Sequence, residues 1–278
     1  MYNKFRHKRN YQGPIEAVIL DWAGTTMDHG CMAPAVVFVD VFEKEGVPIT
    51  MEEARIPMGA RKDVHIKQIT EIDTVKKRWK EKFERDPNQD DVNRMFQNFI
   101  PLQLECLSNY SQLIPGTKKI VDELKSRGMK IGSTTGYLTD MVKINLEDGK
   151  KQGYEPDSTV CASDVPQGRP YPYMCLLNAI NLGVTSVEAC VKVDDTIPGI
   201  KEGLNAGMWT IGLATSGNEI GLPLDEMKAL PKAEFETKRA KAYKKMYQCG
   251  AHYVVDSIAD MLPCIDSIQQ RINQGDRP

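Results

Sequence analysis

The sequence predicts an α/β protein: a Rossmann-like parallel sheet covered by helices, with an inserted domain that is all helical. Short apolar runs alternate with segments of helical spacing over most of the 278 residues. Residues 31–106 interrupt this alternation with helical patterns alone. Alternating strands and helices form a parallel sheet that is covered on both faces and binds ligands at the carboxyl ends of its strands.

Six segments are predicted as strands. The first, residues 15–22, reads IEAVILDW and lies between Pro14 and the small residues AGTT. A short apolar run rich in Ile and Val and bounded by turn residues is typical of a buried strand. Similar runs, of which the last is the weakest, occupy residues 129–135, 158–164, 189–195, 209–216 and 252–257.

Helices are predicted between these strands. Residues 116–128 place Ile120, Val121 and Leu124 at helical spacing and end at Gly128, which is typical of a helix stop. The same kind of pattern occupies residues 138–152, 171–182 and 197–207.

Five more helices are predicted within the interruption, at residues 33–46, 51–56, 62–71, 73–86 and 90–107. The chain therefore divides into an α/β core domain, residues 14–30 and 107–278, and a helical cap domain, residues 31–106. A domain inserted through two crossings can close over the strand ends and exclude water. The charged runs 75–86 and 236–245 are interpreted as solvated helix faces.

Composition narrows the class of protein. With 36 Lys and Arg, 38 Asp and Glu, and 41% hydrophobic residues, the chain can bury a sizeable core and is not of a disordered or collagen-like type. No apolar stretch approaches the roughly 20 residues that span a bilayer, so we expect a soluble protein without a membrane partner. The slightly acidic balance and the lack of a recognition module argue against nucleic-acid binding.

The cysteines and the first residues bear on location. The seven cysteines are odd in number, scattered and free of CxxC pairs, which favours a reducing, cytoplasmic compartment over a disulfide framework or a thiolate zinc site. Residues 1–13 contain four basic side chains and no acidic one. They lack the features of a transit peptide or a secretory signal, so a disordered basic arm is predicted.

Polar side chains follow four of the predicted strands. Asp21 ends the first strand, residues 133–135 (Ser-Thr-Thr) end the second, Arg169 lies in the loop after the third, and Asp194 and Asp195 end the fourth. A lone Asp before such a turn is more often a turn former. Together, hydroxyls and a guanidinium suit a phosphoryl group, and clustered carboxylates suit Mg²⁺.

The motifs DWAGTT, STTG, QGRP and KVDD, in this order, resemble the four motifs of the haloacid dehalogenase superfamily of phosphoryl-transfer enzymes. Within it, the chain is most similar to the phosphonoacetaldehyde hydrolase (phosphonatase) family, from about Ile15 to the C-terminus. The segments that carry this similarity are AVILDWAGTTMDHGC, EEARIPMGARKDVH, IGSTTGY, DVPQGRPYPYMC and EGLNAGMWT. The resemblance implies a core of the haloacid dehalogenase type and hydrolysis of the C–P bond of phosphonoacetaldehyde.

The resemblance also implies a nucleophile and a metal site. Asp21 would attack phosphorus, and its carboxylate, the carbonyl of Ala23 and Asp195 would hold Mg²⁺. The chain departs from one version of the pattern: an acid, Asp194, precedes Asp195 where some members have glycine, and Gly199 stands where those members have a further acid. Asp194 would then share the metal, either directly or through water.

Position 23 argues against ordinary ester hydrolysis. Phosphatases of the superfamily carry an aspartic acid there that protonates the leaving oxygen, whereas Ala23 has no proton to give. A carbon leaving group needs an electron sink, and the resemblance implies that Lys62 supplies it as a Schiff base with the substrate aldehyde. The amine must be neutral to react, so its pKa should lie below the usual value of about 10.4.

The remaining implied roles fall on the segments next to these residues. Lys62 and His65 share a face of the predicted helix that follows Pro57 and Gly59. The side chains implied to surround the aldehyde and move protons are His65, Cys31, Met58 and Tyr137. The groups implied to bind the substrate are Thr135, Gly136, Arg169 and Gly59. Met58 and Cys31 could equally be packing residues, and Tyr137 a helix-start residue.

Two other functions stay open at this point. One is a phosphatase of the same superfamily that acts on a small phosphate ester. The other is a binding protein that keeps the fold without activity, against which the presence of both Asp21 and Asp195 argues. The resemblance alone implies a homodimer.

Overall fold

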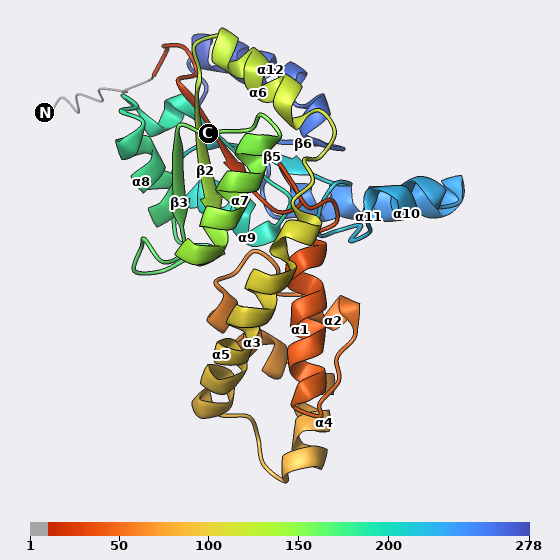
Figure 1. Cartoon of the computed structure of the whole chain (residues 1–278). Coiled ribbons are helices and arrows are strands. Elements are labelled where there is room, and N and C mark those ends of the chain that lie inside the picture. Colours follow the sequence, from red (N-terminus) through yellow and green to blue (C-terminus); the bar gives the residue numbers. More distant parts are fainter. Residues whose placement is uncertain (1–10) are drawn as a thin grey trace, which may run out of the picture.

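A six-stranded parallel sheet with helices packed around it forms the upper part of the protein in Figure 1. The structure is a computed structural model that describes residues 11–278. Its strand order is β3-β2-β1-β4-β5-β6, which confirms the predicted Rossmann-like α/β core. The strands are β1 (Ala17–Asp21), β2 (Lys130–Thr135), β3 (Ser158–Cys161), β4 (Cys190–Asp194), β5 (Trp209–Leu213) and β6 (Tyr253–Val255).

Strand β1 holds the position at which the strand order reverses. It pairs with β2 on one side and with β4 on the other, and all five of its residues are buried. The register sets Asp21 opposite Thr134 of β2 and Leu20 opposite Val193 of β4. In open α/β sheets the crevice at this reversal is where ligands bind.

Helices cover both faces of the sheet. Val18 and Leu20 pack in one cluster with α6 (Thr117–Ser126) and α12 (Leu262–Asn273), whereas Ala17 and Ile19 pack in another with α8 (Tyr173–Asn181). Helix α9 (Ile197–Asn205) contacts α8, β4 and β5. The alternation of β1 side chains thus explains the two layers. The other core helices are α7 (Thr139–Lys151), α10 (Leu224–Ala229) and α11 (Lys232–Gln248), with 3-10 turns at Leu107–Tyr110, Val187–Ala189 and Ile258–Asp260.

Five helices between β1 and α6 form a separate bundle, which lies below the sheet in Figure 1. Phe38, Trp79 and Phe99 are fully buried at its centre. This α1–α5 bundle accounts for the helical patterns that interrupt the alternation. Its helices are α1 (Met32–Lys44), α2 (Met51–Arg55), α3 (Lys62–Thr70), α4 (Asp73–Phe83) and α5 (Gln89–Cys106).

The two charged runs lie on α4 and α11. Each helix buries only two side chains, Val75 and Trp79 on α4 and Ala242 and Met246 on α11. Most of the charged side chains of both runs are therefore solvent-facing, as predicted. Helices α10 and α12 were not predicted from the sequence.

Residues 1–10 of the predicted basic arm, residues 1–13, lie outside the described residues. The backbone N–H of Tyr11 donates to the carboxylate of Glu188, 3.0 Å away, so this end of the arm is attached to the core. Among residues 11–278, no helix is long and apolar enough to cross a membrane.

Candidate active site

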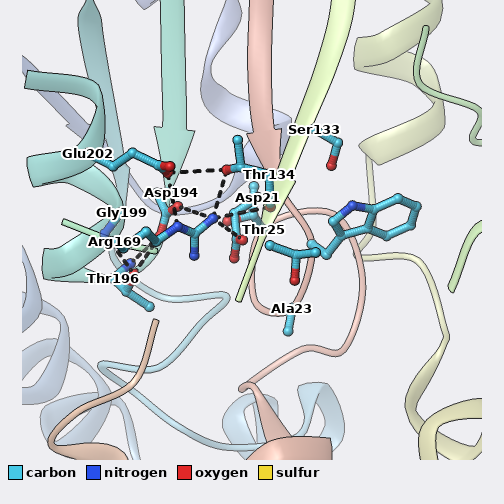
Figure 2. A network of polar contacts seen from close by, with 12 residues as sticks. Asp21, Ala23, Thr25, Ser133, Thr134, Arg169, Asp194, Thr196, Gly199 and Glu202 are labelled. Carbon is cyan, nitrogen blue, oxygen red and sulfur yellow. Dashed lines mark hydrogen bonds and ion pairs between the residues drawn. The ribbon is translucent and has the colours of Figure 1, made fainter. Parts of the chain in front are cut away.

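The candidate active site lies at the carboxyl ends of β1, β2 and β4 (Figure 2). Asp21 is the last residue of β1, and its Oδ1 accepts a hydrogen bond from Arg169 Nη2 at 2.6 Å. Both side chains are buried. Burial raises the pKa of Asp21, while the Arg169 guanidinium acts in the opposite direction. The sheet thus presents one carboxylate directly to one fixed cation.

Three buried carboxylates gather at this point. One ligand atom from each of Asp21, Asp194 and Asp195 lies within 4.8 Å of the others. Burial, reinforced by the charges of Asp194 and Asp21, raises the pKa of Asp195 to about 8. Carboxylate oxygens are the ligands that Mg²⁺ and Ca²⁺ prefer, so the donor set fits a hard divalent cation.

A second layer of buried charge lies beneath these carboxylates. Arg169 Nε donates to Glu202 Oε2 at 3.0 Å, and Lys192 Nζ lies 2.8 Å from Asp194 Oδ2. Lys192 also donates to Thr134 Oγ1 at 2.7 Å. Lys192, Asp194 and Glu202 are fully buried. Unpaired buried charges are costly, so these pairs hold one another in place.

With all four of its carboxylates ionised, this network of buried charges does not balance without a cation. Two buried cations, Arg169 and Lys192, face four buried carboxylates, those of Asp21, Asp194, Asp195 and Glu202. Full ionisation would leave two excess negative charges in a region of low dielectric. One divalent ion would neutralise them, which agrees with the oxygen donor set.

The turn after β1 is built around Asp195. Thr25 Oγ1 donates to Asp195 Oδ1 at 3.1 Å, and Cys31 Sγ donates to Asp195 Oδ2 at 3.2 Å. Gly24 adopts a left-handed backbone with φ of 84°, and a Cβ there would lie 2.4 Å from Asp195 Oδ2. Glycine is therefore required at this position both for its backbone conformation and for the space it leaves.

Lys62, which belongs to the α1–α5 bundle, lines a cavity together with Asp21. It begins α3 and is only 4% exposed, and its Nζ lies 4.7 Å from the centre of the Tyr137 ring. Burial lowers the pKa of Lys62 to about 8. The cavity is lined by Asp21, Ala23, Cys31, Pro34, Met58, Gly59, Lys62, Thr135, Gly136, Tyr137, Arg169 and Thr196.

Most of the predicted site residues therefore share one cavity, and three do not line it. Asp194 and Asp195 lie in the carboxylate cluster beside it. His65 lies behind Lys62, where its ring stacks on Phe38 at 3.8 Å and its Nε2–H donates to the carbonyl of Ala54. Burial, with the charge of Lys62, lowers the pKa of His65 well below its usual value, so the ring is neutral.

Cys31 and Tyr137 are protonated groups on the cavity wall. Burial raises the pKa of the Cys31 thiol and of the Tyr137 hydroxyl well above their usual values. The Cys31 thiol also lies within hydrogen-bond distance of the carbonyl of Ala23, and the Tyr137 hydroxyl finds no hydrogen-bond partner among the described residues. Both groups can donate a proton or a hydrogen bond to a bound ligand.

Lys192 and Glu202 are neighbours of the site that sequence patterns did not single out. Lys192 lies in the middle of the apolar run ACVKVDD, and Glu202 lies on α9. A charged residue inside an otherwise apolar strand is the one signal that could have marked Lys192, because such a side chain needs a buried partner.

A parallel α/β core with an inserted helical bundle and a carboxylate cluster at its strand ends defines a hydrolase of the haloacid dehalogenase-like type. The model of the haloacid dehalogenase-like hydrolase family matches residues 15–207. The chain belongs to this family and, within it, to the phosphonoacetaldehyde hydrolase family.

Two relatives and one solved structure support this membership. The phosphonoacetaldehyde hydrolase of Hahella chejuensis is 45% identical over 274 residues, which cover 99% of this chain and 93% of the relative. That of Syntrophobacter fumaroxidans is 43% identical and covers 99% of both chains. The crystal structure of a phosphonoacetaldehyde hydrolase-like protein from Oleispira antarctica matches with a TM-score of 0.96 and 42% identity, over 99% of this chain and 100% of that one.

Proposed function

We propose that the protein hydrolyses the C–P bond of phosphonoacetaldehyde to acetaldehyde and phosphate, as the names of its relatives indicate for those proteins. One observation carries the proposal. A buried lysine from the α1–α5 bundle and a buried aspartate from the core line the same cavity, although Lys62 and Asp21 come from different parts of the fold. A lysine whose pKa is lowered beside a strand-end carboxylate suits imine chemistry coupled to attack on phosphorus.

The bundle acts as a cap in this proposal. Residues 31–106 form the cap domain, and residues 14–30 and 107–278 form the core domain. The cap brings Lys62 to the substrate, and its closure excludes water that would otherwise hydrolyse an imine early.

The first step takes place at Lys62. Its neutral amine adds to the aldehyde carbon of the substrate. The resulting carbinolamine takes one proton, supplied by Cys31 or Tyr137, and loses water, which leaves a protonated imine. A pKa of about 8 makes part of the amine population neutral near neutral pH, which supports this role. His65, which is neutral and stacks on Phe38 behind Lys62, fixes the orientation of α3 through its bond to Ala54.

The second step takes place at Asp21. Its carboxylate attacks phosphorus, the C–P bond breaks, and the bonding electron pair moves into the protonated imine to give an enamine on Lys62. Arg169, fixed by Glu202, stabilises the negative charge on the phosphoryl oxygens. Thr135 and the backbone N–H of Gly136 bind the same oxygens at the end of β2.

Two hydrolyses complete the cycle. Water attacks the phosphoaspartate and releases phosphate. The enamine takes a proton on carbon, and water then releases acetaldehyde and restores the Lys62 amine. Cys31 and Tyr137 supply protons, because both stay protonated and line the cavity, and Met58 packs against the aldehyde.

Mg²⁺ is the proposed cofactor. The carboxylates of Asp21 and Asp195 and the carbonyl of Ala23 would hold it, with Asp194 either as a direct ligand or through water. The ion would offset the repulsion between Asp21 and the anionic substrate, about 4 kcal/mol per unit-charge pair at 4 Å and an effective dielectric of 20.

The test measures phosphate and acetaldehyde together from phosphonoacetaldehyde, with and without Mg²⁺. Borohydride added with substrate should attach a reduced adduct to Lys62, located by mass spectrometry. Lys62→Arg keeps the charge but cannot become neutral, so turnover should be lost completely. Retained turnover in this variant excludes the imine. If the protein releases phosphate from nitrophenyl phosphate but no acetaldehyde from phosphonoacetaldehyde, it is a phosphatase instead.

A cytoplasmic homodimer completes the proposal. All seven cysteines are free, which suits a reducing compartment. The dimer rests on the resemblance alone, and sedimentation equilibrium of the purified chain tests it.

A further inference from the structure

A single arginine of the α1–α5 bundle contacts two separate parts of the core. Arg55, the last residue of α2, donates from Nη1 to the carbonyl of Gly30 at 2.6 Å and from Nη2 to the carbonyl of Gly221 at 2.9 Å. Its Nη1 also lies 3.4 Å from Asn218 Oδ1. One planar group thus joins the crossing that follows β1 to the loop that follows β5.

The core loop is shaped to receive this guanidinium. Gly221 has a left-handed backbone with φ of +67°, and a Cβ there would lie 2.7 Å from Arg55 Nε. Asn218 returns a hydrogen bond from its Nδ2 to the backbone carbonyl of Arg55 at 3.3 Å. The contact is therefore reciprocal: the arginine side chain binds the loop, and the loop binds the arginine backbone.

The same loop touches the carboxylate cluster. The backbone N–H of Asn218 donates to Asp195 Oδ2 at 2.8 Å, and a Cβ on Gly217 would lie 2.0 Å from that oxygen. Asn218 therefore contacts the cap through its side chain and the carboxylate cluster through its backbone.

Residues 56–61 connect Arg55 directly to Lys62. It makes two more close contacts with the core: a Cβ on Gly59 would lie 2.4 Å from Thr196 Oγ1, and a Cβ on Gly136 would lie 2.9 Å from the carbonyl of Ala60. These two contacts involve uncharged groups. The arginine supplies the charged hydrogen bonds, which are stronger than neutral ones.

We propose that Arg55, received by Asn218 and Gly221, is a positioning residue that holds the cap segment 55–62 on the core and so places Lys62 opposite Asp21. The role rests on the proposed function, because it matters only if both residues act on one substrate. Without the arginine the cap spends less time closed, and the binding-competent fraction of the enzyme falls.

The experiment compares Arg55→Ala and Arg55→Lys with Arg78→Ala. Arg78 is a partly exposed arginine of the same bundle whose ion pair, to Glu53 at 2.5 Å, stays within the bundle. Hydrogen exchange of the ligand-free protein is measured at the backbone N–H groups of Met58 and Ala60, which are hydrogen-bonded within the segment. Exchange should become about 10- to 100-fold faster in both Arg55 variants, as expected for lost hydrogen bonds to a charged donor, and stay unchanged in Arg78→Ala.

Kinetics on phosphonoacetaldehyde separate positioning from loss of folded protein. A smaller closed fraction raises the KM in proportion, whereas a smaller folded fraction lowers only the apparent kcat. We expect the KM to rise about tenfold or more in Arg55→Ala and less in Arg55→Lys, which keeps the charge but not the planar fork. Wild-type exchange and a wild-type KM in both Arg55 variants overturn the proposal.

The exchange measurement does not depend on the reaction. If the wild-type protein fails to cleave phosphonoacetaldehyde but the Arg55 variants exchange faster, the proposed function is wrong while the contact still holds the segment. If the wild-type protein cleaves it and exchange is unchanged in the variants, the function stands and the positioning role is wrong. Arg55→Lys covers the case in which Arg55→Ala does not fold.

Discussion

The carboxylate of Asp194 occupies the space beside Gly199. A Cβ on Gly199 would lie 2.0 Å from Asp194 Cγ, far inside any normal contact. Asp194 also accepts from the N–H and the hydroxyl of Thr196, so its position is fixed. Asp194 and Gly199 therefore depend on each other, because a side chain at position 199 and the Asp194 carboxylate would occupy the same space.

We predict that substitutions of Asp194 and Gly199 are tolerated only when both residues are replaced together. Gly199→Asp alone should lower the free energy of unfolding by about 3 kcal/mol or more, since overpacking of a buried site costs 1–3 kcal/mol and a second buried acid adds repulsion. Asp194→Gly combined with Gly199→Asp should recover most of that loss, as well as Mg²⁺ affinity measured by titration calorimetry. Additive effects of the two changes in urea unfolding would contradict the shared space.

Glu202→Gln should weaken both the fold and substrate binding. The change removes the charged partner of Arg169 Nε inside the buried network, and breaking a buried ion pair costs about 3–5 kcal/mol. Urea unfolding and the KM for the phosphonate measure the two effects. Glu219→Gln is the matched control: its partner Lys245 is 41% exposed, and a pair of this kind contributes under about 1 kcal/mol.

Lys62→Met should remove activity and stabilise the protein at pH 7. Burial lowers the pKa of Lys62 from 10.5 to about 8, a difference worth about 3 kcal/mol. Between these pH values the unfolded chain holds the proton and the folded chain does not, so wild-type stability rises with pH across this window. The advantage of the methionine variant should therefore shrink from pH 8 upward and vanish above pH 10.5.

Urea unfolding at several pH values measures this difference. Lys67→Met, on the same helix but 56% exposed, is the control and should stay within about 0.5 kcal/mol of the wild type at every pH. A methionine variant less stable than the wild type at pH 7 would show that the lysine charge is compensated in the folded protein.

Ala23→Asp should suppress C–P cleavage. The new carboxylate would enter the cavity that Lys62 lines, and a negative charge nearby raises a lysine pKa by about 1–3. We expect kcat/KM at pH 8 to fall at least about tenfold, with its rise moved to higher pH. Ala23→Asn, of the same size but uncharged, should keep the wild-type pH profile. An equal loss in both variants would mean that only bulk matters.

Mg²⁺ should stabilise the protein increasingly as the pH rises towards 8. The pKa of Asp195 is raised from 3.8 to about 8 by burial and by its neighbouring carboxylates, so the folded chain holds a proton that the unfolded chain releases. Stability in the presence of a chelator should therefore fall as the pH rises from 4 to 8. Bound Mg²⁺ replaces that proton, and thermal unfolding with and without EDTA should diverge over this range. Parallel curves would argue against this site.

The parts of the fold that the sequence predicted are those with local signals. Each of the six strands appeared as a short apolar run, and α1–α9 appeared as helical spacing, because both patterns follow from which face is buried. Helix α12 was missed although Ile265, Ile268 and Ile272 mark its buried side. The strand order could not be read from such patterns, since it depends on pairing between distant segments.

The residues of the site also fall into those that the sequence predicted and those that it did not. Asp21 and Asp195 were predicted because strand ends are recognisable in the sequence, and the resemblance supplied Lys62. The partners that fix them were not predicted: Arg55 meets Asn218 across 163 residues. Nothing local in the sequence encodes such contacts.

The central place of β1 has a consequence for how the chain is made. This strand is synthesised before both of its neighbours: Ala17 pairs with Lys130 on one side and with Cys190 on the other. At 5–20 residues per second, the ribosome needs about 5–20 s to deliver the first neighbour and longer for the second. The helices of residues 32–106 pack mainly against one another and leave the ribosome during this interval. We expect the bundle that carries Lys62 to fold before pairing with β2 and β4 fixes Asp21 in the sheet.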